Sequence, residues 1–165
     1  MVHKMTNEAR MNAINENIQV MIDIVNRLDE DTIRWNPSSE EWSIIQIVSH
    51  VAEAIPYWVK QIQNIKLDPS AEWGRGLQDE DRLYAVSEEK INKSDIKELV
   101  SAIEEIPAKV NKCLRALSVK DMEIVAPSRN PNFKGKPIQF IVDNLIVKHI
   151  EGHVSQIKRN LSKRK

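Results

Sequence analysis

Cysteine and glycine are scarce in the sequence. Its single cysteine, Cys113, excludes a disulfide within the chain. A lone cysteine fits a reducing compartment, so we expect a cytoplasmic protein. Four glycines in 165 residues, with few clusters of valine or threonine, argue against a fold rich in β-strands.

Long apolar runs and an excess of charge of either sign are also absent. Lys and Arg number 24, as do Asp and Glu, so the formal net charge is zero and a large basic surface for nucleic acid is not indicated. No run approaches the ~18 apolar residues that span a bilayer, and the polar start MVHKMTNEAR lacks the apolar region of a secretory signal. We therefore expect no nucleic-acid or membrane partner.

Helical periodicity dominates what is present. Apolar residues recur every three or four positions in four segments, at about residues 6–29, 43–66, 95–117 and 137–160. In the second segment, Ser43 and Gln46 have the spacing of a capping box. Ser94 is expected to cap the third helix, and Pro137 to lie in the first turn of the fourth.

These four segments predict an all-α fold, a four-helix bundle that forms a single domain over residues 1–165. Residues 67–94 contain a proline, two glycines and many charges, and a short helix is expected within them at about 79–90. This connection is much longer than a hairpin between neighbouring helices needs. We predict that it crosses back along the bundle, which gives an up-down-down-up order with the second and third helices parallel.

The stretch HIEGH, residues 149–153, carries the chemical signal. At roughly 100° per residue, His149 and His153 point to the apolar face of the fourth helix, whereas Glu151 points away. Two histidines one turn apart can bind one metal ion. The alternative is a pair of core or boundary histidines bonded to backbone or water. Gly152 is expected to let a neighbouring helix approach.

A third histidine is expected at the same level of the bundle. His50 in the second helix and His153 in the fourth each lie about seven residues, or ~10 Å, from the helix end that an antiparallel arrangement would bring together. Three imidazoles without an inward carboxylate suit zinc, nickel, iron or copper, and not magnesium or calcium. Asn15 is a candidate partner for a free imidazole nitrogen.

Two stretches together resemble the DinB/YfiT-like superfamily of metalloenzymes: WSIIQIVSHVAEA at 42–54 and KHIEGHVSQI at 148–157. The resemblance spans almost the whole chain. It implies a four-helix bundle whose divalent metal is bound by His50, His149 and His153. It also implies a homodimer, because members of the family often pair. It also implies relatives that are thiol-dependent S-transferases using bacillithiol or mycothiol, or maleylpyruvate isomerase-like proteins.

The resemblance favours a metal-dependent transferase that takes a low-molecular-weight thiol and a small-molecule substrate. The catalytic group would then be a thiolate on the metal, or a water molecule for the alternative of a hydrolase or isomerase. A second alternative is a non-catalytic bundle that is stabilised by metal or binds a protein partner.

The mouth of the site is expected at the bundle end near residues 30–42, where the returning segment arrives. An arginine of that segment could bind a carboxylate of the thiol cosubstrate, although ordinary anchoring of the loop explains the same residues. The candidates there are Trp73, Arg75, Arg82 and Tyr84. Other aromatic residues are expected to serve packing, namely Trp35, Trp42 and Trp58.

Overall fold

The structure is a computed structural model and describes residues 5–164, so His3 lies outside the described residues. Within that range the chain is helical and forms no strand, apart from two isolated bridges between single residues. The helices are α1 (Asn7–Asn26), α2 (Glu30–Arg34), α3 (Ile44–Leu67), α4 (Glu80–Ala85), α5 (Glu88–Asn92), α6 (Ile96–Glu104), α7 (Ile106–Arg115), α8 (Val119–Met122), the 3-10 turn η1 (Pro131–Phe133), α9 (Ile138–Phe140), the π-helix η2 (Ile141–Val147) and α10 (Lys148–Lys163).

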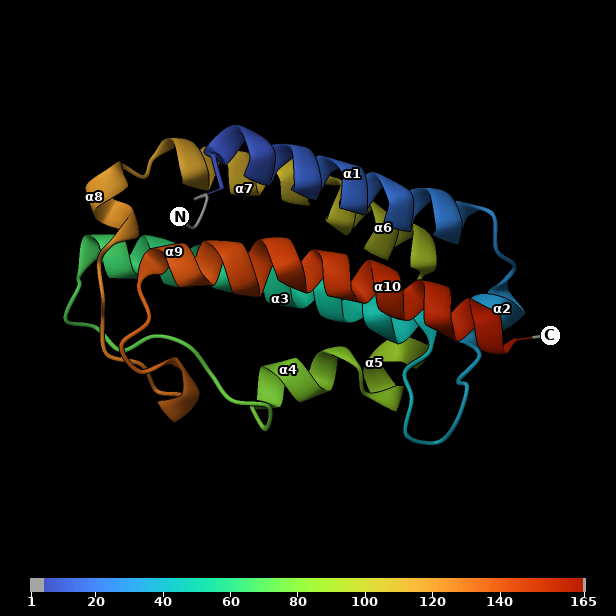
Figure 1. The fold of residues 1–165 in the computed structure, drawn as a ribbon. Helices are drawn as coiled ribbons and strands as arrows, with labels where there is room; N and C mark the ends of the chain where they lie inside the picture. The colour runs from blue at the N-terminus through green and yellow to red at the C-terminus, as the bar shows by residue number, and fades with distance from the viewer. Residues whose placement is uncertain (1–4, 165) are drawn as a thin grey trace.

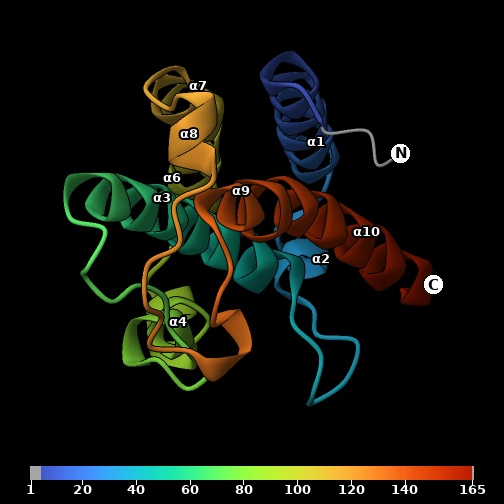
Figure 2. The same ribbon diagram turned by 60° about the vertical axis from the view of Figure 1, so that its left-hand side comes forward.

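The fold is a four-helix bundle, as the sequence predicted. Its four long rods are α1, α3, the α6–α7 pair and the continuous α9–η2–α10 helix (Figure 1). Figure 2 shows α3 and α10 side by side, with α1 and α6–α7 on one side of them and α4 on the other. The segment between α3 and α6 therefore forms an extra layer over α3 and α10.

Side-chain hydrogen bonds show which helix ends meet. The Asn160 amide of α10 donates to the Trp42 carbonyl just before α3, so the end of α10 lies at the beginning of α3. Arg34 of α2 donates to the Ser94 carbonyl just before α6, which places the beginning of α6 at this same end. The two helices α3 and α6–α7 accordingly run in the same direction, and residues 68–95 travel back along the bundle between them (Figure 1).

Helix boundaries follow the capping rules with two corrections. The capping box of Ser43 and Gln46 is confirmed at the start of α3. Asp95, not Ser94, caps α6, because its carboxylate accepts from the Lys97 amide while the Ser94 hydroxyl donates to a carbonyl of the preceding helix. The fourth rod begins one residue later than predicted, since the backbone of Pro137 is extended and caps the helix from outside.

The predicted third helix is broken into α6 and α7. The break falls at Glu105, two residues before Pro107. A proline lacks the amide hydrogen and its ring clashes with the preceding turn, so an uninterrupted helix is disfavoured there. Both pieces still bury their apolar stripe in one core with the other three rods.

The core is built from the predicted stripes, and isoleucine dominates it. Ile14 of α1, Ile47 of α3, Ile103 of α6 and Ile150 of α10 are each at most 1% exposed. Among the described residues, none of the helices has both the length and the apolar character needed to cross a membrane.

Candidate metal centre

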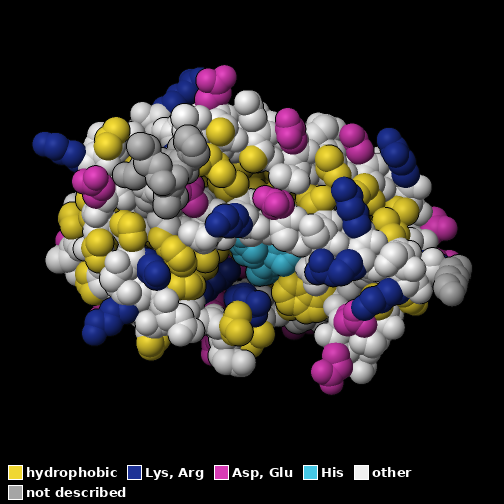
Figure 3. Space-filling model, in the orientation of Figure 1, with side chains coloured by type: hydrophobic (Ala, Val, Ile, Leu, Met, Phe, Trp, Pro, Cys, Tyr) yellow, Lys and Arg dark blue, Asp and Glu magenta, His cyan; other side chains and the backbone are white. Residues whose placement is uncertain are grey.

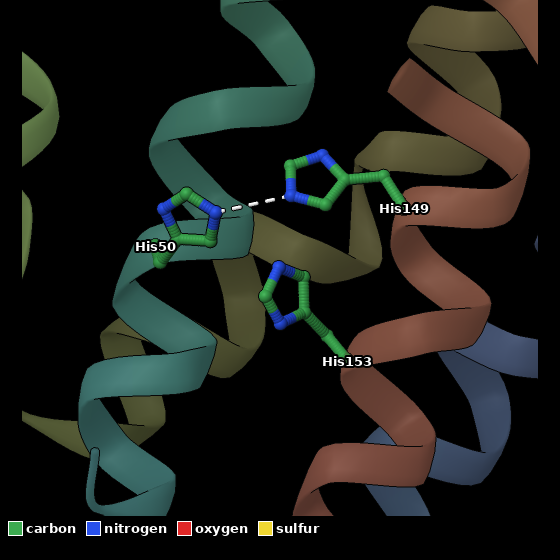
Figure 4. Close-up of side chains that lie close together, drawn as sticks. All are labelled: His50, His149 and His153. Carbon is green, nitrogen blue, oxygen red and sulfur yellow. Dashed lines mark hydrogen bonds between the residues drawn. The ribbon is translucent and has the colours of Figure 1, made fainter. Parts of the chain in front are cut away.

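Three histidines from two helices converge at the centre of the α3–α10 contact. His50 projects from α3, and His149 and His153 project one turn apart from α10 (Figure 4). One ring nitrogen of each lies within 4.8 Å of the other two. The Nε2 atoms of His50 and His149 are 3.1 Å apart. The structure therefore brings together all three histidines that the sequence selected.

The outer nitrogens of two rings are held by the protein. His149 Nδ1 lies 3.0 Å from the Leu145 carbonyl oxygen, and His153 Nδ1 lies 2.8 Å from Oε1 of Gln156. A carbonyl can only accept, so His149 donates through Nδ1 and its Nε2 carries a free lone pair. The same tautomer of His153 directs its Nε2 lone pair into the cluster. Such bonds to the outer nitrogen typically fix imidazoles that bind metals.

Hydrogen bonding among the rings does not satisfy them. One N–H···N bond can join His50 to His149, but Nε2 of His153 and Nδ1 of His50 are both buried and find no partner among the described residues. An unsatisfied buried polar atom is costly.

A metal ion is compatible with the spacing of the His50 and His149 nitrogens and satisfies more of the inner nitrogens than a hydrogen bond does. At 2.0–2.1 Å from an ion, two nitrogens lie about 2.9 Å apart at a right angle and about 3.4 Å apart at a tetrahedral angle. The observed 3.1 Å separation of the His50 and His149 nitrogens falls between these values. An ion would also satisfy Nε2 of His153.

Burial keeps the three imidazoles neutral. Loss of solvation, together with repulsion from the other imidazoles and from Arg82, lowers the pKa of His50 to about 2. Burial lowers the pKa of His149 to about 4 and also lowers the pKa of His153. At neutral pH the rings therefore present lone pairs without first releasing protons, which is the state that binds metals.

Trp42 forms one wall of the cluster. Its ring centroid lies 5.0 Å from that of His50 and 6.4 Å from that of His153, where the rings stack. The sequence indicated packing for Trp42 but not contact with the site. Its position directly before the Ser43 cap could have indicated this contact, because the residue that precedes α3 lies beside the end of α10.

A pocket of about 210 Å³ opens beside His50 and His149. Figure 3 shows the histidines at the floor of a hollow on the flank of the bundle, with basic side chains at its margin. The residues that line this flank pocket are His50, Ala54, Trp58, Arg75, Gly76, Leu77, Arg82, Asn130, Phe133, Asn144, Leu145 and His149. Trp58 is thus both a packing residue, as predicted, and part of the pocket wall.

The predicted mouth at the end of the bundle requires a correction. A hollow of about 280 Å³ does lie there, between the loop before α3 and the end of α10, but His153 is its sole histidine. His50 and His149 face the flank pocket instead. The crossover passes alongside α3 and covers the middle of the bundle, so the opening lies at its side (Figure 2).

The returning segment contributes two of its four candidates to this pocket. Arg75 and Arg82 line it. Trp73 is buried, stacks on Phe133 and donates from Nε1 to the Ala126 carbonyl, so it anchors the loop away from the histidines. Tyr84 is 46% exposed and does not line the pocket.

Two further expectations were wrong. Asn15 is exposed and borders a hollow between α1 and α7, so it cannot hold an imidazole nitrogen. Gly152 is also exposed, and a Cβ built there would meet nothing within 4 Å, so no helix depends on its missing side chain. The outward position of Glu151 is confirmed, since it is exposed. Cys113 is buried, which raises its pKa to about 11.

The fold and the cluster define a class of protein: a four-helix bundle with a three-histidine cluster open to a side pocket. The chain belongs to the DinB superfamily, whose family model matches residues 13–157. No curated protein matches the sequence significantly.

Among solved structures, the chain is similar to YfiT from Bacillus subtilis, described as a probable metal-dependent hydrolase with an unusual four-helix bundle topology. The TM-score is 0.78 at 13% sequence identity, and the match covers 99% of this chain and 91% of that one. At this identity the likeness shows a shared fold.

Proposed function

We propose that His50, His149 and His153 bind one divalent transition-metal ion, and that the protein is a metal-dependent enzyme of the thiol S-transferase type. The observation that carries the proposal is the convergence of three neutral imidazoles, two of them oriented through Nδ1, beside a pocket that no carboxylate lines. Zinc, nickel and iron are the ions that such nitrogen ligands favour.

Three protein ligands leave a coordination position for an exogenous group, as in catalytic rather than structural zinc sites. When bound, the ion would lower the pKa of a thiol or a water molecule at that position. The chain itself supplies the lone pairs, through imidazoles that burial keeps unprotonated. Trp42 covers one side of the cluster, and the flank pocket opens on another beside His50 and His149.

The absence of an acidic lining residue supports the thiol over a water molecule. Metal-dependent hydrolases commonly use a carboxylate as a general base beside the metal, as in the HExxH proteases. Glu151 is exposed, and no Asp or Glu of the described chain lines the flank pocket. A thiol needs less help, because a coordinating thiol is deprotonated by the ion alone.

A metal-dependent hydrolase is the second candidate, and the description of YfiT favours it. A cytoplasmic location, a homodimer and a single domain over residues 1–165 remain predictions from the sequence.

Elemental analysis tests the metal site. We expect about one equivalent of metal in the wild-type protein and a large loss in His50→Ala, His149→Ala and His153→Ala. Asn144→Ala, which also changes the pocket lining but removes no imidazole, is the matched control and should retain the metal. Equal metal in all five proteins would show that the histidines do not form the site.

Activity assays with zinc-, nickel- and iron-loaded protein separate the candidate reactions. Conjugation of bacillithiol to a chloro-aromatic acceptor would support S-transfer. Ester or amide hydrolysis without conjugation would favour the hydrolase. If neither reaction occurs with any of the three metals, S-transfer and hydrolysis are both refuted, which leaves an isomerase or a bundle that binds metal for stability or binds a protein partner.

A further inference from the structure

We infer that the flank pocket beside His50 and His149 binds a small organic carboxylate, with Arg82 as its charged anchor. As an assignment of substrate class, this inference rests on the proposed metal-dependent activity. As a binding site for an anion, it depends on Arg82 and the pocket walls and can be tested without any metal.

The two arginines of the pocket differ in how their charges are compensated. Arg75 donates from Nη1 and Nη2 to the carboxylate of Glu53, at 2.8 and 2.5 Å, and from Nη1 to Asp79 at 3.2 Å. Its guanidinium also lies 3.9 Å above the ring of Tyr57. Arg75 is 8% exposed and serves to pin the crossover onto α3.

Arg82, in contrast, has no carboxylate within ion-pair distance in the described part of the chain. Its side chain donates from Nη1 to the Leu77 carbonyl, at 3.0 Å. A guanidinium has five N–H donors, so most of them remain available to a ligand. Glu53 and Asp79 balance the charges of the two arginines in sum, but both carboxylates contact Arg75, so Arg82 faces the pocket without a carboxylate of its own.

The position of Arg82 directs this charge toward the histidines. Its Cζ lies 5.9 Å from the ring centroid of Trp42, the residue that packs on His50 and His153. The backbone is held by Asp79, whose carboxylate accepts from the Arg82 amide at the start of α4. A carboxylate bound by Arg82 would therefore place the rest of its molecule in the pocket beside His149.

The other residues that line the pocket indicate the chemical character of the rest of the ligand. Trp58, Phe133 and Leu145 offer apolar surface to a hydrocarbon or aromatic body. The Asn144 amide already donates to the Phe140 carbonyl, so its oxygen is left to accept from a hydroxyl or amino group of the ligand. Asn130 is held on both sides, since its amide donates to the Arg75 carbonyl and its oxygen accepts from the Asn132 amide. The volume of about 210 Å³ limits the ligand to a small molecule.

The charge of the site favours a carboxylate over a phosphate. A phosphate group carries up to two negative charges and is usually bound by several donors from arginines, lysines or backbone amides. This pocket offers one guanidinium without a carboxylate partner among the described residues, which matches the single charge and planar shape of a carboxylate.

Binding of phenylacetate and of its neutral analogue phenylacetamide to chelator-treated protein provides the test. Both probes present the same ring to the apolar wall, and isothermal titration calorimetry measures each Kd. We expect phenylacetate to bind the metal-free wild type at least tenfold more tightly than phenylacetamide, since only the former can form charge-assisted hydrogen bonds. Raising the salt concentration should reduce this preference. This comparison requires no variant, so it does not depend on how substitutions affect folding.

Variants then assign the preference to Arg82. Arg82→Gln should abolish it and Arg82→Lys should retain part of it. The matched control Arg159→Gln removes a cation from the other hollow, beside His153, and should change nothing. Equal binding of the two probes, no binding of either, or an undiminished preference in Arg82→Gln would each overturn the inference.

The inference and the proposed function fail separately. An Arg82-dependent carboxylate preference in His149→Ala, a variant expected to lose the metal, would still support the pocket. Loss of metal from the histidine variants with no carboxylate preference in the wild type would leave the metal site intact and refute the anion site.

Discussion

Acidification should destabilise the metal-free protein because its central histidines are buried as neutral bases. In the unfolded chain a histidine has a pKa near 6.5, whereas burial lowers the pKa of His50 to about 2 and that of His149 to about 4. Below pH ~6.5 the unfolded chain therefore binds more protons than the folded one. The free energy of unfolding must then fall as the pH falls, from the unfolded pKa down to the folded values.

The size of the effect follows from the two pKa values. Each pH unit below the unfolded pKa costs about 1.4 kcal/mol per histidine for as long as the folded ring stays neutral. At about pH 5 the folded rings of His50 and His149 remain almost wholly unprotonated. The loss relative to about pH 8 is about 2 kcal/mol for each, or about 4 kcal/mol for the pair.

Urea unfolding in the presence of a chelator, at about pH 8 and about pH 5, measures this loss. The double variant His50→Gln/His149→Gln is the control, because glutamine is polar but does not titrate. In this variant the loss between the two pH values should shrink by about 4 kcal/mol, and what remains comes from other titrating groups such as His153, whose pKa burial also lowers. If wild type and variant lose the same free energy of unfolding, the reasoning from histidine burial is refuted.

Two further substitutions test other parts of the structure. Gly152→Ala should stabilise the protein by about 0.5–1 kcal/mol, because the position is helical and exposed with open space around its Cβ; a loss in thermal stability would contradict this. Glu53→Gln should cost about 1–3 kcal/mol in urea unfolding, because it removes the charge that faces the buried Arg75. The exposed pair of Glu89 and Lys93 gives the control, since Glu89→Gln should change stability by less than about 0.5 kcal/mol.

The parts of the fold that were predictable are those that periodic burial determines. Apolar spacing predicted the four long helices because each must bury one apolar stripe. The Ser43–Gln46 capping box could be predicted because it depends on two residues three positions apart. The pairing of His50 with His149 and His153 followed from helix geometry and the length of the crossover. All of these are local or repetitive features of the chain.

The parts of the structure that could not be predicted depend on tertiary contacts that produce no periodic pattern in the sequence. Asn15 and Gly152 were assigned to the site region from their places on a helical wheel, yet both are exposed, because a wheel does not show which neighbour covers an edge. The flank pocket is built by the crossover, whose path is set by the buried pair of Arg75 and Glu53. A contact between Arg75 in the irregular crossover and Glu53 in α3, 22 residues earlier, leaves no pattern in the sequence.

The π-helix η2 lies directly before the histidines of α10. It belongs to a helix that the sequence predicted, but its irregular hydrogen bonding was not predicted. Within it the Lys148 amide donates to the Asp143 carbonyl, five residues back, so backbone pairing is shifted by one residue relative to an α-helix. At its end the Leu145 carbonyl accepts from the ring of His149, and the side chains of Asn144 and Leu145 line the pocket. The same irregular turn thus supplies the bond that orients one inner nitrogen and part of the wall that a substrate would touch. π-turns are rare and often mark functional sites, and η2 lies directly beside the proposed metal centre.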